Sequence, residues 1–414
     1  MSLAALVAKP AAHVRLIGVI SAAHFTSHIY ILILAPLLPF VRAEYGVSYT
    51  EIGLALAAFN VVSAVLQTPA GFLVDWLGAR ALLIGGLVIG ALSFIVVGLV
   101  DSFWVMVAMF ALAGVGNTVY HPADYSLLSH HVPSERIGQA YSIHTFAGLL
   151  GSAVTPASLL IMQNLWGWRG AFIGAGLFGL AVAAILTLVR EEPVVAPVKR
   201  ADAGQTADGG TQSANLQTAS PQTASRQTAW QLLMSTPILL NLFFFVLIAM
   251  MSGGMFTYSV VALDALYGTP VTVGNGALST LLLLSAIGVL IGGVMVARTE
   301  RHGLTASLGL IGMALPAALV GFIDFSTLWL VVVMSTFGFF FGFISPSRDM
   351  IVRDATPPGS FGKVFGFVTT GFNLGGIVSP MIFGAIMDAG HPRLVFLVVA
   401  ASALIAIATV ATVP

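Results

Sequence analysis

The sequence predicts an all-α membrane protein in which twelve transmembrane helices form two pseudo-symmetric six-helix bundles. Three observations support this fold class: an apolar composition, an internal repeat and the distribution of basic residues. Of the 414 residues, 58% are hydrophobic and only 8% are charged. Soluble domains carry roughly 25% charged residues, so this chain needs lipid as the solvent for its apolar surface.

The internal repeat relates two segments at a constant offset of 224 residues, with no gap. The matched pairs are Pro122 with Pro346, Pro133 with Pro357, Gly138 with Gly362, Gly151 with Gly375, and Pro156 with Pro380. A long repeat in an apolar chain predicts two similar halves that face each other, which is a common design for a transporter.

Twelve apolar stretches are long enough to cross a bilayer, for which a helix needs about 20 residues. Six lie in the first half, at about 15–40, 51–74, 80–100, 103–128, 138–163 and 169–189. Six lie in the second half, at about 236–264, 273–297, 304–323, 327–350, 362–387 and 391–412. The runs are continuous rather than alternating, so helices are expected and barrel strands are not. The first stretch exceeds a signal-peptide core of about 7–15 residues, so it is expected to be retained as a span.

Basic residues predict the orientation, because Lys and Arg concentrate in cytoplasmic loops. With both termini cytoplasmic, only Arg42, Arg169 and Arg393 lie outside. The other thirteen lie inside: Lys9, Arg15, Arg80, Arg136, Arg190, Lys199, Arg200, Arg226, Arg298, Arg301, Arg348, Arg353 and Lys363. Segment 191–231 lacks Phe, Tyr and Ile, which predicts a disordered cytoplasmic linker between bundles at 1–190 and 232–414.

Several functional classes are disfavoured by composition. The net charge is zero, which gives no indication of a nucleic-acid partner. The absence of cysteine excludes disulfides and thiol catalysis. No G-x-x-x-x-G-K-[ST] motif occurs, so ATP is not expected as the energy source, and no cofactor is expected. An embedded enzyme would need a converged acid/base or metal constellation, which scattered histidines do not supply by sequence, so no enzyme is predicted.

A loop motif joins the second and third predicted spans, with Gly71, Asp75, Gly78 and Arg80 in the spacing G-x-x-x-D-x-x-G-x-R. Gly71 would let helices approach closely, and Asp75 could cap a helix N-terminus or pair with Arg80. Just before the second span, the run from Ser48 to Glu51 fits a capping box.

The loop motif, the twelve spans and the central linker resemble the major facilitator superfamily. The resemblance implies alternating access and a monomer. It also implies that Asp75 faces the start of the eleventh helix, near Gly362. The second-half counterpart of the loop has Ala297 in place of the acid.

Within that family, the first half is similar to fosmidomycin-resistance-type efflux proteins. The similar stretches are 24–28, 32–39, 48–53, 63–69, 120–122, 142–143 and 148–156. The sequence departs from that pattern in three places. His28 replaces the first-helix acid, Ala123 with Asp124 replaces the acid after His-Pro, and Thr155-Pro156 replaces the Gly-Pro of the antiporter motif.

Intramembrane polar residues are costly, so they are functional candidates by default. The candidates for the substrate and proton pathway are His24, His28, Asn60, Gln67, Asn117, His121, His144 and Asn373. Histidine suits a proton carrier because its reference pKa is about 6.5, so we expect His28 or His24 to take and release a proton. The alternative is that both are hydrogen-bonded packing residues. No metal is expected, because the spans need not converge and no carboxylate accompanies the first pair.

The inner-gate candidates are Asp124, Arg348 and Asp349. The offset of 224 residues places Asp124 opposite Arg348. The cytoplasmic ends of the fourth and tenth helices approach each other when such a transporter opens outward, which predicts an ion pair between these two residues in that state. Two alternatives for Arg348 are binding of an anionic substrate and snorkelling to the interface.

The favoured function is proton-coupled efflux of a small organic compound or drug by an inner-membrane antiporter. One alternative is uptake of a small organic anion by proton symport. Another, from a different class, is a transport-inactive membrane sensor or assembly factor.

Overall fold

The computed structural model describes residues 12–133, 136–189, 229–357 and 361–411, and within these it contains helices and no β-strand. The first half contains α1 (Ala12–Leu32), η2 (Ala35–Leu37), α2 (Leu38–Tyr45), α3 (Tyr49–Leu77), α4 (Ala79–Leu99), α5 (Phe103–Asn117), α6 (Tyr120–His131) and α7 (Ile137–Leu188). The second half contains α8 (Ala229–Leu233), α9 (Thr236–Ser252), η3 (Gly253–Tyr258), α10 (Ser259–Tyr267), α11 (Val271–Val296), α12 (His302–Phe322), α13 (Thr327–Asp354), α14 (Phe361–Asp388) and α15 (Arg393–Ala411).

The described residues contain eleven helical segments that are long and apolar enough to cross a membrane. One of them, α7, has 52 residues, or about 78 Å of helix, more than twice a hydrocarbon core of about 30 Å. Its backbone leaves the helical region at Gly167, which has φ 72° and ψ 169°. This break divides α7 into two spans, so all twelve predicted spans are present.

Other breaks within single spans follow from proline and glycine. Pro36 and Pro39 stand at the starts of η2 and α2, where a missing N–H is tolerated, and they interrupt the first span. The fourth span is divided between α5 and α6 just before Pro122. The seventh span contains the π-helical turn η3, which begins with Gly253 and Gly254. Such interruptions loosen backbone pairing where side chains of other helices enter.

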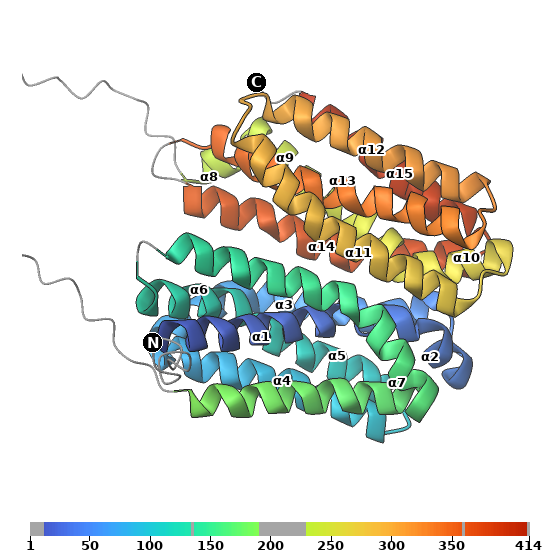
Figure 1. Ribbon diagram of the computed structural model, residues 1–414, viewed down its shortest axis with the longest axis horizontal. Helices are drawn as coiled ribbons and strands as arrows, with labels where there is room; N and C mark the ends of the chain where they lie inside the picture. Colours follow the sequence, from blue (N-terminus) through green and yellow to red (C-terminus); the bar gives the residue numbers. More distant parts are fainter. Residues whose placement is uncertain (1–11, 134–135, 190–228, 358–360, 412–414) are drawn as a thin grey trace, which may run out of the picture.

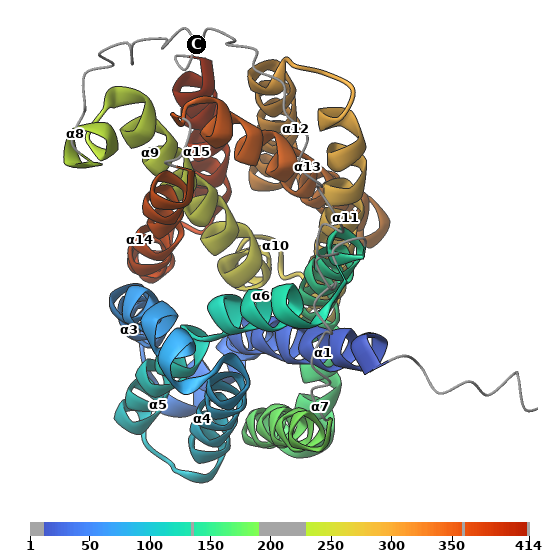
Figure 2. The same cartoon turned by 90° about the vertical axis from the view of Figure 1, so that its left-hand side faces the viewer.

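The helices of the two halves lie in two separate groups, one below the other in Figure 1 and again in Figure 2. We call the end where α1 begins and α15 ends the terminal end, and the other the opposite end. The predicted linker at 191–231 lies outside the described residues except for residues 229–231, which begin α8.

The opposite end is sealed by contacts between the halves. The carboxylate of Asp388, at the end of α14, accepts hydrogen bonds from the backbone N–H of Tyr49 (2.8 Å) and Thr50 (2.9 Å) and from the Thr50 hydroxyl (2.6 Å). The predicted capping box is confirmed, because Glu51 N–H donates to Ser48 Oγ while the Ser48 N–H donates to the Glu51 carboxylate. The first turn of α3 is thus capped from its own half and from the other half.

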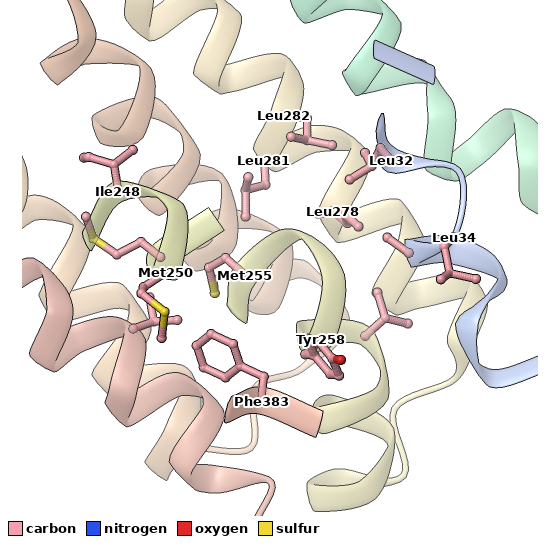
Figure 3. Close-up of a cluster of buried hydrophobic side chains, with 14 of the residues drawn as sticks. Leu32, Leu34, Ile248, Met250, Met255, Tyr258, Leu278, Leu281, Leu282 and Phe383 are labelled. Carbon is pink, nitrogen blue, oxygen red and sulfur yellow. The ribbon is translucent and has the colours of Figure 1, made fainter. Parts of the chain in front are cut away.

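A hydrophobic cluster reinforces this seal. Figure 3 shows Leu32 and Leu34 of the first half beside Leu278 of α11, with Tyr258 and Phe383 in the same buried cluster. The Tyr258 hydroxyl donates to the carbonyl of Pro380 (3.0 Å), which satisfies its polar end. The two halves therefore share one apolar core near the opposite end.

Candidate functional site

Four histidines from three helices meet inside the first half, and we refer to them as the histidine cluster. His24 and His28 are one helical turn apart on α1, His121 is on α6 and His144 is on α7. The ring centroids of His24 lie 4.7 Å from His28, 5.3 Å from His121 and 3.9 Å from His144. His24 and His144 are buried, whereas His121 is exposed. The four candidate histidines thus converge, although the sequence alone did not require it.

The donor and acceptor of each hydrogen bond within the cluster can be assigned consistently. The His24 Nδ1 lies 3.0 Å from the carbonyl oxygen of His144, and a carbonyl only accepts, so this nitrogen carries the proton. The Nε2 of neutral His24 then accepts from the Nε2–H of His28, 3.1 Å away. The Nδ1 of His28 in turn accepts from the hydroxyl of Ser152, at 2.8 Å. This assignment, inferred from the partners, gives a chain from Ser152 through His28 to His24.

Asp124 lies beside this chain as a buried carboxylate without a hydrogen bond. Its side chain is fully buried, and its Oδ2 lies 3.7 Å from the Nε2 of His144. Neither carboxylate oxygen has a hydrogen-bond partner among the described residues, and neither ring nitrogen of His144 has one. At 3.7 Å the carboxylate and the imidazole are too far apart for a hydrogen bond, and burying an unpaired charge is costly.

Other titratable groups near the cluster are tyrosines. They are Tyr30 on α1, Tyr120 and Tyr125 on α6, and Tyr141 on α7. The rings of Tyr125 and His144 are 5.6 Å apart. Apart from these tyrosines, the titratable groups of the cluster are the carboxylate of Asp124 and the four imidazoles.

A glycine on α7 makes room for the cluster. A Cβ at Gly148 would lie 2.8 Å from the Nε2 of His28 and 2.9 Å from the Cε1 of His24. Any side chain at this position would push the two imidazoles away from their present positions. Three residues on, Gly151 similarly faces the backbone of Phe25, with a Cβ position 3.1 Å from its Cα. The glycines quoted for the resemblance thus let α7 pack directly on α1.

Three histidines could in principle hold a metal ion, since donor atoms of His24, His121 and His144 all lie within 4.8 Å of one another. Ligands of a tetrahedral zinc ion are only about 3.3 Å apart, as follows from Zn–N bonds of about 2.0–2.1 Å. In this arrangement, moreover, the His24 Nε2 is paired with His28. The arrangement fits hydrogen bonding, and the expectation of no metal stays a prediction.

A second constellation surrounds Arg348 on α13. Its Nε and one terminal nitrogen both lie 2.9 Å from Oδ1 of the neighbouring Asp349. Its guanidinium carbon lies 4.8 Å from the ring centre of Phe245 on α9 and 5.3 Å from that of Phe372 on α14. Residues from three helices of the second half therefore hold this cation.

In the present conformation Asp124 and Arg348 do not form the ion pair that is predicted for the outward-open state. Arg348 is paired with Asp349, whereas Asp124 is buried inside the first half next to His144. The offset aligned the two positions in sequence but did not fix which way each faces. On α6 the exposed neighbour of Asp124 is Tyr125, so the acid points into its own bundle and not toward α13.

The amide candidates separate into two groups. Asn373 on α14 donates to the side-chain oxygen of Gln67 on α3 (3.1 Å), across the boundary between the halves. Asn60, also on α3, packs against Gly376 of α14, where a Cβ would lie 2.5 Å from its Oδ1. Asn117 instead donates to Ser63 (3.3 Å) within the first half. The first three thus form a polar seam between α3 and α14.

The loop motif is only partly described. Gly78 has φ 91°, a conformation that favours glycine, and it connects α3 to α4. Arg80 donates to the carbonyls of Leu186 (2.7 Å) and Thr187 (3.1 Å) near the end of α7. The Cβ position of Gly71 is open, so the predicted close helix packing there is not seen. The predicted contact of Asp75 with the start of α14 lies outside the described residues.

Sequence comparison identifies the family of this fold. A family model described as Major Facilitator Superfamily matches residues 20–277 and 242–413. The chain belongs to the Major Facilitator Superfamily. The resemblance seen in the loop motif and the span pattern is thereby confirmed.

Individual relatives match only part of the chain. A probable L-galactonate transporter of Escherichia coli is 31% identical over 34% of this chain and 32% of its own length. A probable sulfoacetate transporter of Cupriavidus necator is 28% identical over 40% and 38%, respectively. The fosmidomycin resistance protein of Escherichia coli is 26% identical over 41% and 42%. The matches thus span less than half the length of these relatives.

A solved structure supports the same fold. A bacterial homologue of the human lysosomal transporter Spinster superposes with a TM-score of 0.75, covering 95% of each chain at 13% identity. At this identity the likeness establishes the arrangement of helices and not the solute.

Several residues that shape these sites were not among the predicted candidates. Ser152 belongs to the helix-five motif but was not a candidate. Its position one turn of α7 after Gly148 is a signal that could have identified it as a polar residue on the same face. Phe245 and Phe372 carry no signal that separates them from packing aromatics. Asp388 lies at a helix end, where the sequence shows an acid but not its distant partner.

Proposed function

We propose that this protein is a secondary active transporter that couples the movement of a small organic solute to protons by alternating access. The histidine cluster with Asp124 carries this proposal. It is a set of four imidazoles, two of them buried, beside a buried carboxylate that has no hydrogen-bond partner among the described residues, inside a helix bundle where such groups are costly. With both termini cytoplasmic in the inner membrane, the sealed opposite end faces outward. This arrangement corresponds to an inward-facing state.

The hydrogen-bond chain favours His28 over His24 as the proton acceptor. The His24 Nδ1–H is committed to a carbonyl, and its Nε2 is occupied by His28. The Nδ1 of His28 faces a hydroxyl, which can rotate from donor to acceptor. An added proton on this nitrogen can therefore donate to Ser152 without breaking the bond to His24. The nearby Asp124 carboxylate would offset the positive charge gained by the cluster.

Uptake by symport is our favoured direction, and the relatives named as L-galactonate and sulfoacetate transporters support it. Moving an organic anion together with a proton reduces the net charge carried through a low-dielectric core. Efflux by antiport is the second candidate, supported by the similarity to the fosmidomycin resistance protein.

The test uses purified protein in liposomes that enclose a pH-sensitive dye. We would add L-galactonate, sulfoacetate or fosmidomycin outside and follow both solute uptake and internal pH. Symport acidifies the interior as solute enters, whereas antiport makes it alkaline. Solute uptake with no pH change would contradict proton coupling, and absence of uptake of all three solutes would favour the transport-inactive alternative.

Two histidine variants locate the proton. We expect His28→Ala to retain solute movement down its gradient while losing most of the accompanying pH change. The matched control is His130→Ala, because His130 is exposed on α6 outside the cluster and is hydrogen-bonded to Ser126 and Ser129 of its own helix. An unchanged proton signal in His28→Ala, or an equal loss in the control, argues against the assignment.

A further inference from the structure

We infer that Arg348 is the subsite for the anionic head of the solute, and that Asp349 occupies it as an internal substitute until the solute arrives. This inference rests on the proposed transport function and names its solute class: small organic acids bearing a carboxylate or sulfonate. The argument has three parts, which are the geometry of the ion pair, the placement of the guanidinium, and the exposure of its partner.

The ion pair between Arg348 and Asp349 has poor geometry. Both contacting nitrogens of Arg348 meet the same oxygen, Oδ1 of Asp349, each at 2.9 Å. The tightest carboxylate–guanidinium pairs instead use two oxygens in parallel. Residues adjacent in sequence do not face each other on a helix, so Asp349 cannot reach that arrangement easily. The carboxylate of a free solute has no such constraint.

The guanidinium is held ready for a ligand by aromatic rings. It lies against the faces of Phe245 and Phe372, within the range of about 6 Å over which a cation is attracted to an aromatic ring. A guanidinium held against aromatic rings keeps N–H groups that can donate to an anion. Phe245 is fully buried, whereas Phe372 is partly exposed.

Asp349 is free to leave the pair. Its side chain is 43% exposed, while that of Arg348 is only 14% exposed. An exposed carboxylate regains water when it leaves an ion pair, so releasing it costs little. Asp349 can therefore give way to an arriving anion.

The decisive experiment measures binding at equilibrium, with no membrane and no proton gradient. Purified full-length protein in detergent is titrated calorimetrically with L-galactonate, sulfoacetate and fosmidomycin. L-Galactose serves as the uncharged counterpart of L-galactonate. We expect at least one anion to bind and the neutral sugar to bind at least about tenfold more weakly, because a charged hydrogen bond is lost.

Substitutions at the adjacent residues Arg348 and Asp349 are expected to change anion affinity in opposite directions. Arg348→Gln should weaken anion binding at least about tenfold, and Arg348→Lys should recover only part of it because the forked geometry is gone. Asp349→Asn should strengthen binding several-fold, since the competing carboxylate has lost its charge. Arg353→Gln, on the exposed end of the same helix, is the matched control and should bind as the wild type does.

Each outcome decides the inference. If Asp349→Asn weakens binding as Arg348→Gln does, the two residues form a structural pair, and the inference is wrong. It is equally wrong if Arg348→Gln binds normally, or if no anion binds to the wild type. The unfolding temperature of every variant without ligand checks its folding. If the anion-binding experiment fails, the liposome test of proton-coupled transport can still succeed. If the liposome test fails, anion binding at Arg348 can still be measured.

Discussion

Asp388, on the last turn of α14, caps the first turn of α3 by accepting hydrogen bonds from the backbone N–H and the hydroxyl of Thr50. The two residues belong to different halves and are 338 positions apart. The contact places an anion at a helix N-terminus, where both the free N–H groups and the helix dipole favour it. This cap connects the halves at the sealed end, so it should bias the transporter toward the present conformation.

We therefore predict that Asp388→Asn opens the opposite end more often. Charged hydrogen bonds of this kind contribute about 1.5–3 kcal/mol each, and the amide retains part of this, so a shift of about 1–2 kcal/mol is expected. The measurement is the distance between spin labels introduced by Ala43→Cys and Ala389→Cys, which is simple because the chain has no native cysteine. Asp324→Asn, another exposed acid, is the control. An unchanged distance distribution would show that the cap does not hold the gate.

A substitution at Gly167 tests whether the break in α7 requires glycine. Its φ of 72° and ψ of 169° lie in a region that residues with a Cβ rarely adopt. The turn is anchored by the next two residues, since Trp168 and Arg169 both bond to Glu44. We predict that Gly167→Ala lowers stability by about 1–3 kcal/mol, measured as the unfolding temperature in detergent.

The control for this change is Gly18→Ala on α1, where a Cβ would meet no atom within 4 Å. Alanine should there be neutral or stabilising because it favours the helix. If both variants lose the same stability, backbone strain at Gly167 is not the cause.

The buried carboxylate of Asp124 should cost stability while serving transport. Because neither of its oxygens has a partner, Asp124→Asn removes a charge without removing a hydrogen bond. We predict an unfolding temperature at least as high as that of the wild type, together with a reduced number of protons moved per solute. Asp354→Asn, at the exposed end of α13, should change neither quantity. A large fall in stability would mean that the carboxylate is hydrogen-bonded in the native protein.

The fold could be predicted closely because the length and hydropathy of a segment are enough to identify a membrane-spanning helix. The breaks at Pro36 and Pro122, the capping box at Ser48 and the separation near Gly167 all arise from local chemistry that the sequence displays. Helix ends were predicted less well at the terminal end, where α13 continues to Asp354 beyond the predicted apolar run.

The site was harder to predict, because it depends on how each helix is rotated about its own axis. The spacing of His24 and His28 placed them on one face, but only packing brought His121 and His144 to that face. The same uncertainty applies to Asp124, which in this structure lies beside His144 and not beside Arg348. An offset between repeats aligns positions, yet a rotation of about 100° per residue decides whether a side chain enters its own bundle or the space between bundles.

The position of Gly148 offers a way to disturb the proposed proton pathway without replacing a polar residue. A methyl group there would contact the Nε2 of His28 and the Cε1 of His24, so one imidazole has to move. Because both rings are held by hydrogen bonds on other sides, the shift should break the bond between them. We predict that Gly148→Ala costs about 1–3 kcal/mol of stability, as overpacking usually does, and that it uncouples solute from proton movement.

The matched change is Gly138→Ala on the same helix, where a Cβ would meet no atom within 4 Å. It should leave both the unfolding temperature and the proton signal close to those of the wild type. If Gly148→Ala instead retains full coupling, the contact between His24 and His28 is dispensable. The other candidates for proton uptake in the cluster are then His121 and the pair of Asp124 and His144.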